Sequence, residues 1–183
     1  MASKKDALNK QQYDKLWKAA RSGDDLDRVL FVLTAQLGLR KGEAAQVRDS
    51  WLDFQRKYIQ IPEKDGDWTP KTPHAARRVY WKHLNKAEKI IPDYFEFNSN
   101  IPIKAKSINY RVNKWARKAD LKVNVYPHAL RATAALKFAS AGFSAQALRS
   151  IMGWADLETA NKYISASSRA VEQDLERYGD QIE

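Results

Sequence analysis

The chain has 183 residues, of which 44% are apolar and 30% charged, a composition that fits a globular protein with a real core. The absence of cysteine excludes disulfides, thiolate zinc sites and a cysteine nucleophile. No apolar run approaches the ~18 residues of a membrane span, and the start lacks the apolar stretch of a signal peptide. We therefore expect a cytoplasmic protein without a membrane partner.

The charge of the chain indicates a class of partner. A net charge of +10 favours a polyanion, most simply nucleic acid, although charge alone is equally compatible with a basic protein that binds none. The three histidines, His74, His83 and His128, are too scattered to predict a metal site. We expect neither a metal nor a cofactor.

The first part of the chain is predicted to be helical. Asn9 is placed to cap an amphipathic helix, with Gln12 at the capping-box position, and Gly38 is placed to end a second, apolar helix. The predicted helices cover residues 9–22, residues 24 or 25 to 38, and residues 42–47.

A short β-rich region is predicted next. Aromatic and β-branched residues predict a hairpin over residues 51–61, with Asp53 to Lys57 as its turn, and Arg77 to Trp81 predict a third strand. The polar stretch from Glu63 to Pro73, which contains glycine and proline, predicts a loop.

The remainder is predicted to be helical again, with an irregular stretch from Pro92 to Pro102. The predicted helices cover residues 84–90, 105–119, 127–141, 144–152, 156–164 and 167–178. The sequence thus predicts a single domain over residues 1–183, mainly α with a small three-stranded antiparallel β-sheet.

Two arginines and a histidine are candidates for binding an anion. His128 and Arg131 are three residues apart at a helix start, so both can reach one ligand. A helix N-terminus favours an anion, and a guanidinium can grip two phosphate oxygens. The alternatives are a capping histidine with a surface arginine and, for Arg40, a cation at the end of a helix. Glu43 could orient an arginine or simply favour the first turn of its helix.

Tyr163 is the candidate nucleophile. A phenol with a pKa near 10 attacks poorly at pH 7 unless its proton is removed or the phenolate is stabilised, and nearby cations would help. The alternative is core packing, since apolar residues share its segment.

In order along the chain, these residues lie in motifs that resemble the catalytic domain of the tyrosine recombinase (phage integrase) family. The resemblance covers residues 10–178. It rests on Leu37-Gly38-Leu39-Arg40-Lys41-Gly42-Glu43-Ala44, on Pro70-Lys71-Thr72 before Arg77-Arg78-Val79, on Pro127-His128-Ala129-Leu130-Arg131-Ala132-Thr133, and on Ile151-Met152-Gly153-Trp154 followed by Thr159 and Tyr163.

The resemblance implies a site-specific recombinase that cleaves and rejoins double-stranded DNA without metal or ATP, and so integrates or excises a mobile element or viral genome. In this reading Tyr163 forms a 3′-phosphotyrosyl bond, and Arg40 and Arg131 clamp the non-bridging oxygens. Lys71 protonates the departing 5′-oxygen, with Lys64 of the same loop as the alternative. His128 assists as base or donor, and Trp154 packs against the site. Most of the family has histidine in place of Trp154, but some members carry tryptophan.

The resemblance also implies an architecture. Complete members carry an N-terminal core-binding domain and assemble as tetramers on paired DNA sites. Only about nine residues precede the first predicted helix here, so we expect an isolated catalytic domain with weak, salt-sensitive DNA binding. The C-terminal helix could dock on a neighbouring protomer or on its own core.

Basic residues of the predicted 105–119 helix and its start are candidates for DNA contact, the alternative being a solvated helix face. They are Lys104, Lys106, Arg111, Lys114 and Lys118.

Two other functions are compatible with the candidate catalytic residues: a type IB topoisomerase, which shares this chemistry, and a DNA-binding module that keeps the fold without catalysis.

Overall fold

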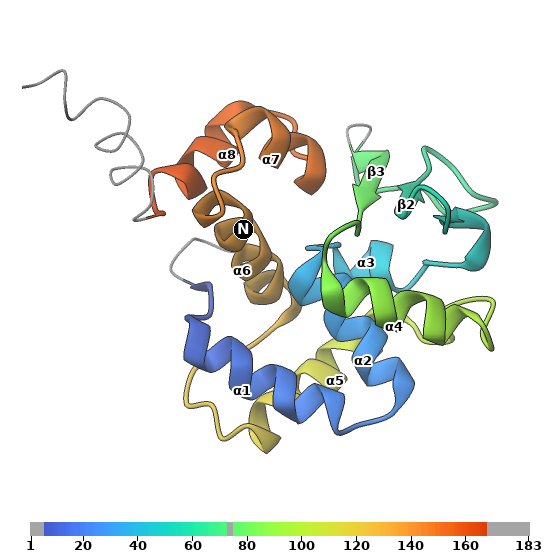
Figure 1. The fold of residues 1–183 in the computed structure, drawn as a ribbon, viewed down its shortest axis with the longest axis horizontal. Helices are drawn as coiled ribbons and strands as arrows, with labels where there is room; N and C mark the ends of the chain where they lie inside the picture. Colours follow the sequence, from blue (N-terminus) through green and yellow to red (C-terminus); the bar gives the residue numbers. More distant parts are fainter. Residues whose placement is uncertain (1–5, 73–74, 168–183) are drawn as a thin grey trace, which may run out of the picture.

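The computed structural model describes residues 6–72 and 75–167, and it is mainly helical with a small sheet at one edge (Figure 1). The helices are α1 (Lys10–Arg21), α2 (Asp25–Phe31), α3 (Lys41–Ala44), α4 (Asn85–Phe95), α5 (Ala105–Lys118), α6 (Pro127–Ser140), α7 (Ala145–Met152) and α8 (Leu157–Ile164). The strands are β1 (Leu52–Asp53), β2 (Tyr58–Ile61) and β3 (Arg77–Tyr80). The predicted fold class is confirmed, while the helix predicted at 167–178 lies outside the described residues.

Helix α1 begins where its capping signal predicts. The Asn9 side chain accepts from the Gln12 amide at 2.9 Å, and the Gln12 side chain accepts from the Asn9 amide at 3.0 Å. The amide of Leu8 donates to Thr133 Oγ1 at 2.8 Å, which joins the start of α1 to α6.

The second helix changes its winding before it reaches Arg40. Helix α2 continues into a π-helical turn at Val32–Gln36, where the amide of Leu37 donates to the Val32 carbonyl at 2.9 Å. Gly38 then adopts a φ of +70°, and a Cβ there would lie 2.8 Å from the Met152 Cε. The predicted stop at Gly38 is therefore confirmed; the left-handed backbone favours glycine, and a Cβ would also displace the end of Met152.

The strand order is β1-β2-β3, and all pairs are antiparallel. Ile59 pairs with Val79, and Ile61 pairs with Arg77. Because side chains alternate along a strand, Arg77 points to the same face as the buried Val79. The sheet thus directs one arginine toward the interior.

The predicted irregular stretch from Pro92 to Pro102 is wrong at its beginning. Pro92 lies inside α4, which continues to Phe95. Proline removes one backbone hydrogen bond, but Ile91, Tyr94 and Phe95 are buried, so packing holds the helix through the last turn. The third helix is also shorter than predicted, since α3 ends at Ala44.

The apolar side chains form two clusters that meet on α6. The larger cluster joins α1, α2, the sheet, α4 and α5, and it includes Leu130. The smaller one joins α6, α7 and α8, and it includes Ala132, Met152 and Tyr163. In Figure 1, α7 and α8 accordingly lie together on one side of α6, and α1, α2 and α5 lie on the other.

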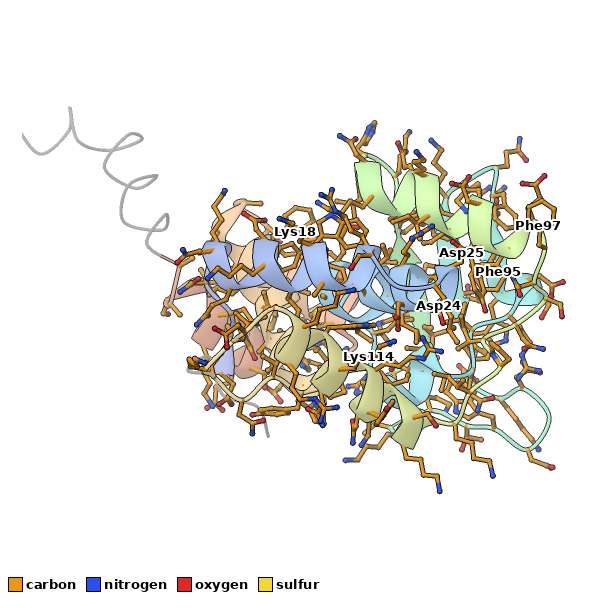
Figure 2. The ribbon with its side chains drawn as sticks, turned by 90° about the horizontal axis from the view of Figure 1, so that it is seen from below. Lys18, Asp24, Asp25, Phe95, Phe97 and Lys114 are labelled. Atoms are coloured by element: carbon orange, nitrogen blue, oxygen red, sulfur yellow. The ribbon has the colours of Figure 1, made fainter. Side chains whose placement is uncertain are left out.

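Charged side chains connect α2 to α5 on the face shown in Figure 2. Asp27 is buried, and Arg111 pairs with it at 2.6 Å and with Asp24 at 2.9 Å. The ammonium of Lys114 lies 3.6 Å from the other oxygen of Asp27. A buried carboxylate needs such partners. No helix of the described residues is long and apolar enough to cross a bilayer.

Candidate active site

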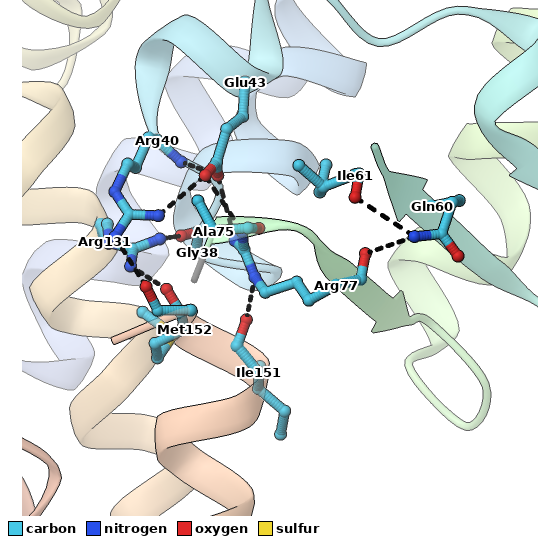
Figure 3. A network of polar contacts seen from close by, with 11 residues as sticks. Gly38, Arg40, Glu43, Gln60, Ile61, Ala75, Arg77, Arg131, Ile151 and Met152 are labelled. Atoms are coloured by element: carbon cyan, nitrogen blue, oxygen red, sulfur yellow. Dashed lines mark hydrogen bonds and ion pairs between the residues drawn. The ribbon is translucent and has the colours of Figure 1, made fainter. Parts of the chain in front are cut away.

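Glu43 is the centre of a buried network of polar contacts (Figure 3). Its Oε1 accepts from Arg40 Nη1 at 2.8 Å and from Arg77 Nη1 at 3.0 Å. Its Oε2 accepts from the Arg40 amide at 2.8 Å and from Arg77 Nη2 at 3.0 Å. Burial works to raise the pKa of Glu43, but the charges of Arg77, Arg131 and Arg40 lower it to about 2. The carboxylate is therefore ionised at neutral pH.

The end of α7 is held by three arginines through three consecutive carbonyl groups. Arg77 Nε donates to the Ile151 carbonyl at 2.7 Å, Arg131 donates to that of Met152, and Arg40 Nη2 donates to that of Gly153 at 2.9 Å. The last carbonyls of a helix have no partner within it and carry its negative dipole end. Arg40, the residue before α3, and arginines of β3 and α6 satisfy them here.

Arg131 is buried, at 6% exposed. It also donates to the carbonyl of Gly38, which the left-handed turn at that residue presents. Burial and the neighbouring charge of Arg40 lower the pKa of Arg131 to about 9, so it stays protonated at neutral pH. Its two carbonyl bonds use two of five N–H donors.

The charges of this cluster do not cancel. Arg40, Arg77 and Arg131 supply three positive charges, and Glu43 supplies one negative charge. An excess of positive charge in a poorly hydrated site attracts an anion strongly. The site is thus suited to a phosphate group.

His128 lies in the first turn of α6, one helical turn before Arg131. Partial burial lowers its pKa, and the positive charges of Arg131, Lys41 and Lys71 act in the same direction. A histidine whose pKa is below 6.5 is mostly neutral at pH 7. His128 is therefore able to accept a proton from a neighbouring group.

Tyr163 packs against Trp154. Their rings are stacked at 5.2 Å with an interplanar angle of 13°, and the Arg131 guanidinium lies 6.0 Å from the Trp154 ring. Burial raises the pKa of Tyr163, and the positive charge of Arg131 opposes that rise. Tyr163 is 7% exposed, so the core-packing and nucleophile readings are both compatible with its position.

The two candidate lysines, Lys64 and Lys71, are both exposed in the loop that precedes β3. The positive charge of Lys71 contributes to the lowered pKa of His128. This interaction favours Lys71 over Lys64, but the role of either lysine stays a prediction.

The basic residues predicted to contact DNA fall into two groups. Lys104, Lys106 and Lys118 are exposed, whereas the guanidinium of Arg111 and the ammonium of Lys114 are paired with Asp27. The structure thus gives Arg111 a stabilising role within the fold.

Sequence reasoning missed the part that Arg77 plays, because it treated the residue only as a member of a strand. A signal was available in the sequence. Side chains two residues apart in a strand point to the same face, so Arg77 is expected to face the same side as the apolar Val79 and Trp81. A charge on an inward-facing position needs a buried partner. The sequence had no means of naming Glu43 as that partner.

The helical fold with its three-stranded sheet, and the arginine cluster beside Tyr163, together define a catalytic domain of the tyrosine recombinase class. The sequence model of the Phage integrase family matches residues 6–169. The chain therefore belongs to the phage integrase family.

The curated relatives that the chain resembles include tyrosine recombinases. The chain is 28% identical to the tyrosine recombinase XerC of Chlamydia caviae over 153 residues, which are 80% of this chain and 49% of that protein. A XerC of Staphylococcus aureus is 22% identical over 148 residues, which cover 78% of this chain and 50% of the relative. The chain thus spans about half the length of the curated relatives it matches.

Solved structures share the fold. A XerA recombinase superposes with a TM-score of 0.74 at 22% identity, covering 94% of this chain and 64% of that one. The catalytic domain of the bacteriophage HP1 integrase superposes with a TM-score of 0.66 at 16% identity, and 93% of each chain is covered.

Proposed function

We propose that this chain is the catalytic domain of a site-specific DNA recombinase, which cleaves and rejoins DNA through a 3′-phosphotyrosyl intermediate. The observation that carries the proposal is the excess positive charge of the arginine cluster beside Tyr163 and Trp154. A pentacoordinate phosphorane-like transition state gathers negative charge on its non-bridging oxygens, and fixed cations there lower the barrier.

The proposed step exchanges one phosphate ester for another. The Tyr163 oxygen attacks phosphorus as its proton passes to His128 or to water, and the bond from phosphorus to the 5′-oxygen breaks. Lys71 gives a proton to the departing 5′-oxygen, while neutral His128 serves as the base for the Tyr163 proton or donates a hydrogen bond to a phosphate oxygen. Arg40 and Arg131 bind the non-bridging oxygens. The phosphodiester energy stays in the tyrosyl ester, so attack by a 5′-hydroxyl reverses the step.

The proposed substrate is double-stranded DNA, which the chain would meet in the cytoplasm. A Tn1549 transposon integrase of the same fold was solved in complex with transposon right end DNA, and a XerH recombinase was solved bound to its difH substrate. The exposed Lys104, Lys106 and Lys118 are proposed to contact phosphates, which gives affinity without sequence choice. Assembly as a tetramer on paired sites, and integration or excision of a mobile or viral element, belong to the same proposal.

Covalent trapping tests the proposal. Labelled DNA of mixed sequence is nicked so that the short fragment bearing the 5′-hydroxyl diffuses away after cleavage. It is mixed with the protein at low salt and resolved on a denaturing gel. We expect a labelled adduct with the wild type and with Tyr80→Phe, whose tyrosine is 52% exposed on β3. We expect none with Tyr163→Phe. An adduct that survives Tyr163→Phe would refute the assignment of the nucleophile.

A relaxation assay separates the proposal from a type IB topoisomerase. A recombinase is expected to leave supercoiled plasmid without its site unchanged. Relaxation of any plasmid by the monomer would identify a topoisomerase instead. DNA binding without an adduct at any salt concentration would indicate a non-catalytic binding module.

A further inference from the structure

We propose that Arg77 is a positioning residue of this site: it neutralises Glu43 and fixes the end of α7, so that Arg40 and Arg131 keep their charge for the phosphate. The inference rests on the proposed function. It concerns a residue of β3 whose side chain is almost wholly buried, at 6% exposed. Figure 3 shows Arg77 extending from its strand toward Glu43 and Ile151.

The hydrogen bonds of Arg77 leave it almost no capacity to grip DNA. Nε donates to the Ile151 carbonyl at 2.7 Å, and Nη1 donates to that of Ala75 at 2.6 Å. Nη1 and Nη2 donate to the two oxygens of Glu43, each at 3.0 Å. These bonds occupy four of the five N–H donors of a guanidinium. Arg77 therefore acts through other residues.

The first of these residues is Glu43. Its carboxylate is 3% exposed, and Arg40 and Arg77 each give it two hydrogen bonds. Without Arg77, the carboxylate of Glu43 would keep hydrogen bonds from Arg40 alone. The positive charge of Arg40 would then be offset by the negative charge of Glu43. Because Arg77 supplies a separate counter-charge, the charge of Arg40 remains available to an incoming phosphate.

The second contact of Arg77 connects the arginines that are proposed to bind phosphate to the segment that positions Tyr163. The Ile151 carbonyl that it binds lies in the last turn of α7, shortly before Gly153 and Trp154. Gly153 has a φ of +60°, and a Cβ there would lie 3.0 Å from both Cδ and Nη1 of Arg77. The backbone thus approaches the guanidinium as closely as glycine permits. Trp154 in turn stacks on Tyr163, so Arg77 helps to set the position of both halves of the site.

A charge-rescue experiment tests this role. Arg77→Met should lower the rate of adduct formation at saturating DNA about 100-fold, the scale for displaced reactive groups. The double variant Arg77→Met/Glu43→Gln also removes the negative charge that Arg77→Met leaves without its counter-charge. It should recover at least about 10-fold of the lost rate, because Arg77 and Glu43 are in direct contact. Arg77→Lys keeps the charge without the fork and should lie between the wild type and Arg77→Met.

The control variant is Arg78→Met. It removes the same charge from the adjacent position of β3, where the side chain is exposed and bonds to Gln60. Its cleavage rate at saturating DNA should stay within about twofold of the wild type, as expected for a surface position. Any weakening of DNA binding by Arg77→Met, relative to Arg78→Met, should be smaller than its loss of cleavage rate, because DNA has many other contacts and a positioning residue changes the rate of the chemical step more than binding.

A second readout does not depend on recombination. Inorganic phosphate is titrated against the protein while the side-chain Nε–H signals of Arg40 and Arg131 are followed by NMR. Arg77→Met should weaken phosphate binding at least about 10-fold, and the double variant should restore part of it.

Several results would overturn the proposal. One is a double variant no better than Arg77→Met, since a direct contact between Arg77 and phosphate cannot be rescued by Glu43→Gln. Another is unchanged phosphate binding in Arg77→Met. If Arg77→Met does not fold, an Arg77→Lys variant equal to the wild type in both assays would also refute it. A wild type that binds phosphate at Arg40 and Arg131 but forms no adduct would refute the proposed function alone.

Discussion

Replacing Gly153 by alanine should destabilise the domain through one identifiable contact. The left-handed φ of +60° costs a residue with a Cβ about 1–2 kcal/mol. The new Cβ would lie 3.0 Å from Arg77, which four hydrogen bonds hold in place, and such overpacking costs about 1–3 kcal/mol. Alanine lowers the entropy of the unfolded chain, which returns about 0.4–1 kcal/mol. The expected loss in free energy of unfolding is therefore about 1–5 kcal/mol.

Gly66→Ala is a matched control. Gly66 has nearly the same backbone conformation, with a φ of +59°, but nothing lies within 4 Å of its Cβ position. Both variants should show the backbone cost in urea unfolding, so their difference isolates the contact with Arg77. We expect Gly153→Ala to be less stable than Gly66→Ala by about 1–3 kcal/mol. Equal losses would show that Arg77 yields freely, and the account of a rigid guanidinium at the end of α7 would be wrong.

Three further predictions concern Glu43, Tyr13 and Arg111, the last with Lys118 as its comparison. The pKa of Glu43 is lowered to about 2, so its stabilisation is present above the unfolded pKa near 4.5 and is lost as pH falls toward 2. Glu43→Gln should remove up to about 3 kcal/mol of acid-dependent stability between those values, measured by urea unfolding across pH. Tyr13→Phe should raise stability by up to about 1 kcal/mol, since the buried Tyr13 hydroxyl has no hydrogen-bond partner among the described residues; a loss would show a hidden partner. Arg111→Met should cost about 3 kcal/mol because it leaves Asp27 with the more distant Lys114. Lys118→Met should leave stability unchanged but lower the salt slope of DNA binding by about 1, and the reverse pattern would contradict the assignment of the two residues.

Local signals in the sequence were enough for most of the fold. The capping box at Asn9 and the stop at Gly38 each depend on residues within one or two turns, and each is observed. The end of α4 was missed because a proline is a local signal against helix, whereas the burial of Tyr94 and Phe95 is a property of the whole fold.

The candidate site was less accessible to such reasoning. The motifs named Arg40, His128, Arg131, Trp154 and Tyr163 in advance, and their catalytic roles stay predictions. The bonds that arrange them join residues far apart in the sequence: Arg40 meets Gly153 across 113 positions, and Arg77 meets Ile151 across 74. No local pattern specifies such a pairing. The structure was therefore needed to show that Glu43 is shared between two arginines.

The separation of the apolar side chains into two clusters has a consequence for how the domain opens. The smaller cluster, formed by α6, α7 and α8, is rich in alanine and buries little apolar surface. Regions with few buried apolar contacts form cooperative units that open below the free energy of global unfolding. We therefore expect the backbone amides of α7 and α8, including that of Tyr163, to exchange with solvent more readily than those of the larger cluster.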